Sequence, residues 1–228
     1  MKTTGGSDEE KRKAGESAAE EVEDGMVVGL GTGSTAAHAI RALGRRVDSG
    51  LDVRGIPTSF QSRELAKEVG VPLTDLDQVR QVHVAIDGAD QFSGPHLVKG
   101  GGGAHAREKI VDSAADRLLV VADPSKSVKQ LDHSVPVEVL PDARTTAAKE
   151  VRTLGGSASL RTAERKDGPV VTDNGNLLLD CDFGKIPNPA DLAEDLAEIP
   201  GAVEHGLFVG MADEVHVGKE DGVNVKTF

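Results

Sequence analysis

The feature that most constrains the fold of this chain is a series of short aliphatic runs, each of which leads directly into a polar or glycine-rich turn. Residues 26–35 read MVVGLGTGST, residues 82–90 read VHVAIDGAD, and residues 116–126 read DRLLVVADPSK. Aliphatic runs of this length between turn residues are typical of strands that are buried on both faces of a sheet. In open α/β sheets, ligands bind beyond the carboxyl ends of such strands, which is where these polar turns lie.

Segments with helical signals separate these strands. Residues 8–23, 36–47 and 57–69 have the apolar spacing or the capping residues of helices, and residues 51–56 form a further apolar run. Strands that alternate with helices predict an α/β fold, which here is a Rossmann-like, doubly wound and mainly parallel sheet with helices on both faces.

The pattern changes after residue 132 and becomes typical of antiparallel strands. Asn174-Gly175 between two apolar runs predicts a hairpin of residues 170–172 and 177–180. Other elements of this part are expected as strands at 135–140, 158–162 and 203–208 and as helices at 142–154 and 189–199. The sequence therefore predicts a small α+β domain with an antiparallel sheet at 133–206. Residues 1–132 and 207–228, with a strand at 212–217 that rejoins the first sheet, form the α/β domain that is expected to be catalytic.

The charge balance of the chain limits its partners. There are 38 acidic against 26 basic side chains, a formal net charge of −12, and aromatic residues make up 2%. Binding to nucleic acid needs a basic surface and often stacking aromatics, so no nucleic acid is expected as a partner. Recurring acidic clusters at residues 8–10 and 20–24 favour adaptation to a salty cytosol over solubility alone.

No apolar stretch is long enough to span a bilayer, and the N-terminal residues are polar and charged. We therefore expect a cytoplasmic protein that does not act on membranes. Cys181 is the only cysteine, so neither a disulfide framework nor a cysteine-based metal site is expected. Its position in an apolar run predicts a half-buried strand residue.

Residues 31–35 form a turn rich in glycine and hydroxyl groups between a strand and a helix. Such a turn presents backbone N–H groups and the positive end of a helix to an anion, and Ser34 or Thr35 would cap the helix. The third glycine of a dinucleotide fingerprint is missing after Gly29 and Gly31, and no lysine is present for a Walker A loop. We interpret the turn as a site for a single phosphate monoester, with an ordinary capped turn as the alternative.

Residues 99–109, which read KGGGGAHAREK, form the second notable loop. Four consecutive glycines cost much chain entropy, so a merely structural loop has little reason to use them. Lys99 before the glycines and Glu108 after them could hold an anion, or act as a cation and a base around one small molecule. Asp87 and Asp90 could hydrogen-bond to sugar hydroxyls or move protons, and Lys126 could bind an anion.

In their order and spacing, these clusters resemble those of type A ribose-5-phosphate isomerases. The resemblance rests on residues 31–35, 58–59, 87–90, 99–109 and 123–126, and it extends through 136–139, 170–176 and 199–203. It implies reversible interconversion of D-ribose 5-phosphate and D-ribulose 5-phosphate through an enediolate, in the non-oxidative pentose phosphate pathway and without a metal or cofactor. It also suggests a homodimer or homotetramer.

The resemblance assigns roles residue by residue. Glu108 takes the place of the family's proton acceptor, and Lys99 is expected to stabilise the enediolate together with loop N–H groups. Asp87 or Asp90 is expected to move the hydroxyl proton or help to open the sugar ring, and Gln91 stands where many members carry Glu. The substrate-binding positions are matched by Thr32, Gly33, Ser34, Thr35, Asp87, Gly88, Ala89, Asp90, Lys99, Gly100, Gly101, Gly102 and Lys126.

Two other classes of protein share parts of this pattern. A CoA-transferase-like enzyme would use a glutamate as a nucleophile, but it would need room for coenzyme A and usually a longer chain. A sugar-phosphate-binding sensor domain of a transcriptional regulator would need a DNA-binding segment, for which residues 1–25 are too short and too acidic. A sensor also has no need of a base beside a lysine, so an isomerase is the expected function.

Overall fold

The computed structural model describes residues 5–164 and 167–228, which form two compact units. The parallel-sheet unit consists of residues 5–89, 107–127 and 211–228. The antiparallel-sheet unit consists of the described residues within 90–106 and 128–210. This second unit is larger than the small domain predicted at 133–206, because a three-stranded sheet joins residues 91–98 to residues 207–208.

The parallel-sheet unit is built on one sheet of six strands, in the order β13-β12-β6-β3-β1-β2. All neighbours are parallel except β12 and β13, so the predicted mainly parallel sheet is confirmed. The strand predicted at 212–217 returns to this sheet as β12 and pairs with β6. The strands are β1 (Val27–Leu30), β2 (Arg54–Pro57), β3 (Val84–Gly88), β6 (Leu118–Ala122), β12 (Glu214–Lys219) and β13 (Gly222–Thr227).

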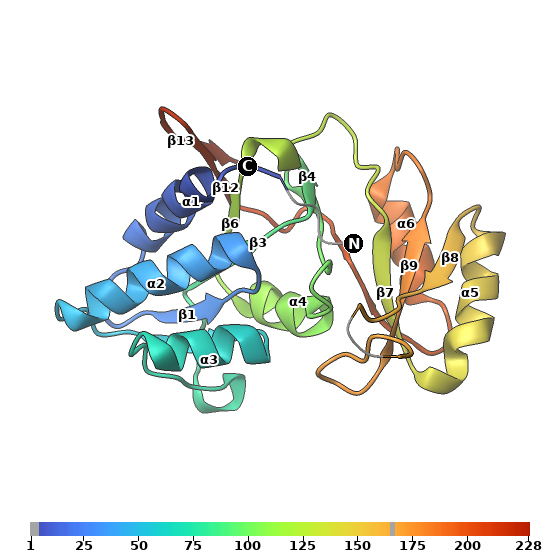
Figure 1. The fold of residues 1–228 in the computed structure, drawn as a ribbon, viewed down its shortest axis with the longest axis horizontal. Coiled ribbons are helices and arrows are strands. Elements are labelled where there is room, and N and C mark those ends of the chain that lie inside the picture. The colour runs from blue at the N-terminus through green and yellow to red at the C-terminus, as the bar shows by residue number, and fades with distance from the viewer. Residues whose placement is uncertain (1–4, 165–166) are drawn as a thin grey trace. The chain divides into compact units, whose positions relative to one another are not determined.

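Helices cover both faces of this sheet. Val28 and Leu30 of β1 share a core with α1 (Asp8–Glu20), α2 (Ser34–Asp48) and α3 (Phe60–Glu68), and Figure 1 shows α1 and α2 side by side. Val27 instead packs with Val111 of α4 (His105–Ala114). Because successive side chains of a strand point to opposite faces, α4 covers the other face. Among the described residues, no helix combines the length and the apolar character needed to cross a membrane.

The antiparallel-sheet unit contains a four-stranded sheet in the order β10-β7-β9-β8. Val137 of β7 packs with Val151 of α5 and Leu196 of α6, and Figure 1 shows both helices beside these strands. The elements are β7 (Val135–Val139), α5 (Arg144–Thr153), β8 (Ser157–Leu160), β9 (Leu177–Asp182), α6 (Pro189–Ala197) and β10 (Ala202–His205). The three-stranded sheet, in the order β11-β5-β4, consists of β4 (Gln91–Ser93), β5 (His96–Val98) and β11 (Leu207–Phe208).

The hairpin predicted around Asn174-Gly175 is only partly formed. The turn is present, since the Gly175 N–H donates to the Thr172 carbonyl at 2.9 Å. Residues 170–172, however, make only the isolated bridge between Val171 and Leu177 instead of a strand. The physical reason is that β9 already pairs with β7 on one edge and β8 on the other.

A buried carboxylate holds this turn instead. Glu138 on β7 is 0% exposed. Its Oε1 accepts hydrogen bonds from Thr172 Oγ1 at 2.9 Å, Asn174 Nδ2 at 3.1 Å and Asn176 Nδ2 at 2.8 Å. The turn is therefore anchored by side chains where a hairpin would use a strand ladder.

The single strand predicted at 203–208 is in fact two strands that belong to different sheets. β10 pairs with β7, and β11 pairs with β5. Gly206 separates them, and its N–H donates to the Pro136 carbonyl at 2.7 Å. The chain thus passes from one sheet to the next at this glycine.

Cys181 on β9 is completely buried, at 0% exposure, so the expectation of a half-buried residue is wrong. Its side chain belongs to the core that α5 and α6 cover. Burial, together with the neighbouring charge of Asp180, raises the pKa of the thiol to about 12. The residue is therefore an inert core side chain at neutral pH.

Candidate active site

In the parallel-sheet unit, the loop of residues 31–35 connects β1 to α2 and is held by Asp87. Oδ1 of Asp87 accepts the Thr32 N–H at 3.0 Å and the Gly88 N–H at 2.6 Å. A Cβ atom at Gly31 would overlap Asp87, so only glycine allows this close approach. Asp87 is 1% exposed and fixes the shape of the loop that the sequence assigns to phosphate.

Three hydroxyl groups meet beside this loop. Oγ1 of Thr32 lies 2.9 Å from Thr58 Oγ1 and 2.7 Å from Ser59 Oγ. Ser59 caps α3, as predicted, in a capping box with Ser62. The polar pair at 58–59 therefore connects the loop after β1 to the start of α3. The contact from the Gly33 N–H to Gln61 Oε1, at 3.3 Å, has no signal in the local sequence.

The N-terminus of α2 begins at the same loop. The expectation that Ser34 or Thr35 caps this helix is wrong, because the helix already begins at Ser34 and its N-cap is Gly33. Within the described part of the chain, no side chain caps it. The N–H groups of the first turn and the helix dipole are therefore directed at the loop without a competing capping oxygen, an arrangement that favours an anion.

Asp87 lies near the end of β3 and Asp90 follows this strand, but the two carboxylates hold different loops. Asp90 lies in the antiparallel-sheet unit, where its Oδ2 accepts the Gly101 N–H at 2.7 Å. Each carboxylate therefore fixes the backbone of one glycine-rich loop. In the described residues, no group of three or more His, Cys, Asp or Glu side chains is arranged to hold a metal ion.

Lys99 opens the second glycine-rich loop and is 2% exposed. Its Nζ lies 5.3 Å from the centre of the Phe208 ring, within the range of a cation–π interaction. The backbone N–H of Lys99 donates to the Gly206 carbonyl at 2.8 Å. Gly100 has a φ of +105°, which residues other than glycine rarely adopt, and the Gly103 N–H donates to its carbonyl at 3.0 Å. The lysine and the loop that follows it are therefore tied to the three-stranded sheet.

The remaining two charged residues of the predicted site, both in the parallel-sheet unit, are buried as well. Glu108, in the first turn of α4, is 4% exposed. Lys126 is 8% exposed and ends a short 3₁₀ helix (Pro124–Lys126) that Asp123 caps by accepting the Ser125 N–H at 2.9 Å. Neither side chain has the exposure of an ordinary solvated surface residue.

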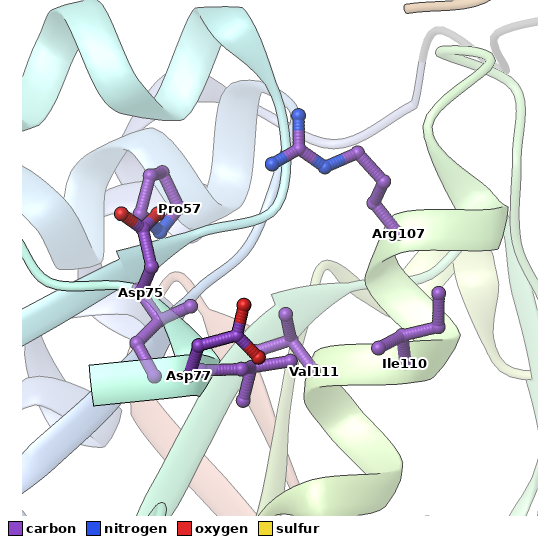
Figure 2. Close-up of a pocket in the computed structure, with 8 residues that line it drawn as sticks. Pro57, Asp75, Asp77, Arg107, Ile110 and Val111 are labelled. Carbon is purple, nitrogen blue, oxygen red and sulfur yellow. The ribbon is translucent and has the colours of Figure 1, made fainter. Parts of the chain in front are cut away.

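A pocket of about 250 Å³ lies beside α4 in the parallel-sheet unit. Figure 2 shows Arg107, Ile110 and Val111 of α4 on one side of it and Pro57 and Asp75 on the other. None of the predicted site residues lines this pocket, which is formed by Ile56, Pro57, Asp75, Leu76, Asp77, Arg107, Ile110 and Val111.

Gln91, which the sequence singled out, has structural contacts. Gln91 donates from Nε2 to Asp132 Oδ1 at 2.6 Å, and its Oε1 accepts the N–H groups of Asp132 and His133 at 2.8 and 2.9 Å. It therefore fastens β4 to the segment that precedes β7. Arg12 of α1 pairs with Glu9 and Glu16 on its own helix.

Comparison with known proteins gives a match over most of the chain. A family profile described as ribose 5-phosphate isomerase A (phosphoriboisomerase A) matches residues 54–222. A relative from Haloarcula marismortui, named ribose-5-phosphate isomerase A, is 68% identical over 223 residues, which are 98% of this chain and 97% of the relative. The match therefore extends over both compact units.

Solved structures agree with the sequence comparison. Ribose 5-phosphate isomerase A from Methanocaldococcus jannaschii is 44% identical, with a TM-score of 0.92 over 96% of this chain and 98% of that chain. A D-ribose-5-phosphate isomerase in complex with phospho-erythronic acid is 41% identical, with a TM-score of 0.95 over 98% of this chain and 100% of that chain.

Proposed function

The chain belongs to the ribose 5-phosphate isomerase A family, and we propose from this membership how its own residues carry out the reaction. The protein is an aldose–ketose isomerase that interconverts D-ribose 5-phosphate and D-ribulose 5-phosphate. This reaction moves a proton between C2 and C1 through an enediolate. It therefore needs a base, a group that stabilises the enediolate charge, and an anchor for the phosphate.

The observation that carries the proposal is the burial of charged side chains in the sequence-matched positions. Asp87, Lys99 and Glu108 are 1%, 2% and 4% exposed. Charged groups are seldom buried to this degree, because removing them from water costs free energy. Buried charges beside glycine-rich loops are typical of residues that act on a substrate.

Glu108 is the proposed base. It removes the proton from C2 of the open-chain aldose and returns it to C1, while the hydroxyl proton moves from O2 to O1. The ammonium of Lys99 stabilises the negative charge on the enediolate oxygens. Asp87 and Asp90 support the reaction by holding the two glycine-rich loops, whose N–H groups they accept.

The phosphate is proposed to bind at the N-terminus of α2. Helix N–H groups and the hydroxyl groups of Ser34 and Thr35 supply donors there, and Lys126 supplies a positive charge. The hydroxyl of Thr32 donates to Ser59 and holds the loop in place. The related enzyme that binds phospho-erythronic acid supports an arrangement in which the phosphate and the reacting carbons of the substrate bind at different places. That ligand has a phosphate at one end and a planar carboxylate at the other, and the carboxylate shares the charge and planarity of an enediolate.

Replacement of the base tests the proposal. Glu108→Gln should reduce kcat by roughly 10²- to 10⁴-fold, the usual contribution of a general base, while inhibition by inorganic phosphate stays unchanged. Asp112→Asn is a matched control, because Asp112 is a buried carboxylate on the same helix, at 3% exposure. A Glu108→Gln variant with near-normal turnover in a coupled assay of ribulose 5-phosphate would falsify the base assignment.

The two lysines can be separated in the same assay. Lys99→Met should lower kcat, because it removes charge stabilisation from the enediolate. Lys126→Met should mainly raise KM, because it removes a phosphate contact that is equal in the ground state and the transition state. Equal effects of the two substitutions on kcat and KM would contradict these separate roles.

Assembly and location are further parts of the proposal. A homodimer or homotetramer is supported by apolar side chains on the antiparallel-sheet unit, since Val203 on the edge strand β10 is 45% exposed and Leu140 is 50% exposed. Light scattering of the wild type and of Val203→Lys tests this interface, and a monomeric wild type would contradict it. A cytoplasmic location follows from the substrate, because sugar phosphates are charged and do not cross membranes unaided.

A further inference from the structure

Arg161 contacts the glycine-rich loop although nothing in the sequence around it suggests a role in the site. It directly follows β8, and its Nη1 donates to the Gly100 carbonyl at 2.9 Å and to the Gly101 carbonyl at 3.3 Å. Both glycines lie among the matched substrate-binding positions, in the same compact unit as Arg161. One guanidinium therefore contacts two consecutive peptide groups of the loop that follows Lys99.

Asp180 of β9 fixes the orientation of this guanidinium. Nε of Arg161 lies 3.1 and 3.0 Å from the two carboxylate oxygens of Asp180, and Nη2 also pairs with Oδ1. Burial alone would raise the pKa of Asp180, but the hydrogen bonds and the charge of Arg161 outweigh it and lower the pKa below its ordinary value. The side chains are 11% and 20% exposed. A paired, mostly buried guanidinium is a rigid fork, with few alternative positions.

The backbone of Arg161 is fixed as well. Its N–H donates to the Leu178 carbonyl at 2.9 Å, and its carbonyl accepts the Val170 N–H at 2.9 Å. The guanidinium thus connects the loop to β8 and β9, which are rigid elements of the four-stranded sheet.

The geometry of the peptide bond shows what this contact does to the loop. In a trans peptide group, the C=O and the N–H point in opposite directions. The carbonyl of Gly100 points to Arg161, and the N–H of the same peptide group, that of Gly101, points to Asp90 at 2.7 Å. The carbonyl of Gly101 also points to Arg161, so the N–H of Gly102 is directed away from the guanidinium.

We propose that Arg161 is a positioning residue for the isomerase reaction, which fixes the peptide groups of residues 100–102 so that the Gly102 N–H is presented to the enediolate. The proposal rests on the function assigned above and adds a residue to it. Asp90 accepts the Gly101 N–H. The Gly102 N–H, in contrast, points away from the guanidinium of Arg161, and it is the loop donor that we assign to the enediolate. A glycine loop without such a clamp would sample many backbone conformations, and donors that are not preorganised stabilise a transition state poorly.

Three variants separate positioning from folding. Arg161→Met removes the fork, Arg161→Lys keeps the charge but cannot contact both carbonyls and Asp180 together, and Asp180→Asn leaves the guanidinium without its charged partner. Arg117→Met is the matched control. Arg117 also pairs with two carboxylates, those of Glu214 and Glu21, in the parallel-sheet unit.

The expected result is a fall of roughly 10- to 100-fold in kcat for Arg161→Met and a smaller fall for the other two variants, with KM changed little. Affinity for phospho-erythronic acid should weaken in parallel with kcat/KM, because its carboxylate lies at the enediolate end. Inhibition by inorganic phosphate should stay within twofold of the wild type. Arg117→Met should lose thermal stability without a change in kcat.

Two results would overturn the inference. One is wild-type kcat and wild-type affinity for phospho-erythronic acid in Arg161→Lys or Arg161→Met. The other is an equal loss of phosphate inhibition, which would indicate a general structural role. If Arg161→Met does not fold, Arg161→Lys and Asp180→Asn decide the question in the same assays.

Failure of the proposed function is recognised separately, because it appears as a lack of turnover in the wild type. In that case, NMR order parameters of the amide groups of residues 100–102 still test the clamp. They should fall in Arg161→Lys relative to the wild type, and unchanged values would contradict the role of Arg161.

Discussion

Individual buried carboxylates keep the loops of this protein in one geometry. Asp87 accepts the N–H of Thr32, Asp90 accepts that of Gly101, and Glu138 accepts three side-chain donors from the turn at 172–176. Hydrogen bonds to an ionised oxygen are stronger than those between neutral groups. A change at one of these carboxylates should therefore affect a loop conformation as well as the free energy of unfolding.

Glu138 offers a direct test of this effect on stability. Glu138→Gln should lower the free energy of unfolding by about 1–3 kcal/mol. The amide oxygen is a weaker acceptor, and the amide nitrogen would occupy the place of Oε2, a buried atom without a hydrogen-bond partner among the described residues. Urea unfolding measures the change. Thr172→Val, which removes one of the three donors, should lower the free energy of unfolding by about 1 kcal/mol. A free energy of unfolding that does not change in Glu138→Gln would contradict the prediction.

His216 makes the stability depend on pH. It is 1% exposed on β12, with Nδ1 2.9 Å from Ser17 Oγ and Nε2 3.4 Å from Glu214 Oε2. Burial lowers its pKa below the ordinary 6.5, although the charges of Glu214 and Glu21 oppose the shift and Arg117 adds to it. The unfolded chain therefore takes up a proton at a higher pH than the folded protein. As a result, stability should decrease as the pH falls below about 6.5.

Thermal unfolding between pH 8 and pH 5.5 checks the contribution of His216. The wild type should lose stability below the ordinary pKa of the imidazole, whereas His216→Gln, which cannot titrate, should show a flatter dependence over the same range. Parallel curves for the two proteins would show that this imidazole does not contribute.

At the scale of the elements, α3 and the loop after β1 are connected through one residue. Ser59 caps α3 and also accepts the hydroxyl of Thr32 at 2.7 Å, whereas Ser62 shares only the capping box. Ser59→Ala and Ser62→Ala should each destabilise the protein, by about 1 kcal/mol for the cap itself. Ser59→Ala alone should also weaken competitive inhibition by inorganic phosphate. Equal phosphate inhibition in both variants would contradict the connection between helix and loop.

Strands that consist of a mainly apolar run between turn residues could be predicted without the structure. The strands β1, β3 and β6 are almost completely buried and are therefore visible as short, mainly apolar runs. β4, β5 and β11 are only three, three and two residues long, too short for a clear pattern, and the sheet that they form is completed by the pairing of β5 with residues 207–208. No local pattern encodes such a distant pairing.

The same distinction applies to the candidate site. Lys99, Glu108 and the polar turns could be found from the sequence, because glycine runs and charged residues after buried strands are local signals. Ser34 and Thr35 were equally plausible caps of α2, and only the backbone shows that Gly33 takes this position. Arg161 could not be found, because it contacts the loop from a position 60 residues further along the chain.

At the scale of the whole molecule, charge is the dominant property. The net charge is −12, and the first turn of α1 alone contains Asp8, Glu9 and Glu10. The relative from Haloarcula marismortui is a protein of a halophilic archaeon, in agreement with the expected adaptation to salt. Repulsion among these exposed charges opposes folding and is screened as the ionic strength rises.

This charge predicts a dependence of stability on salt. Raising KCl from 0.1 M to 2 M should increase the melting temperature by several degrees. An uncharged osmolyte at the same osmolality should have a smaller effect if screening is the cause. A melting temperature that does not change with KCl, or that rises equally with the osmolyte, would contradict this explanation.

The complete burial of Cys181 has a practical consequence. The chain has a single thiol, and its pKa of about 12 and its position in the core prevent reaction with thiol reagents while β9 is folded. Any labelling must therefore pass through an opening of the four-stranded sheet. The rate of that labelling measures how often the sheet opens, so the protein contains its own probe of local unfolding, with no engineered cysteine required.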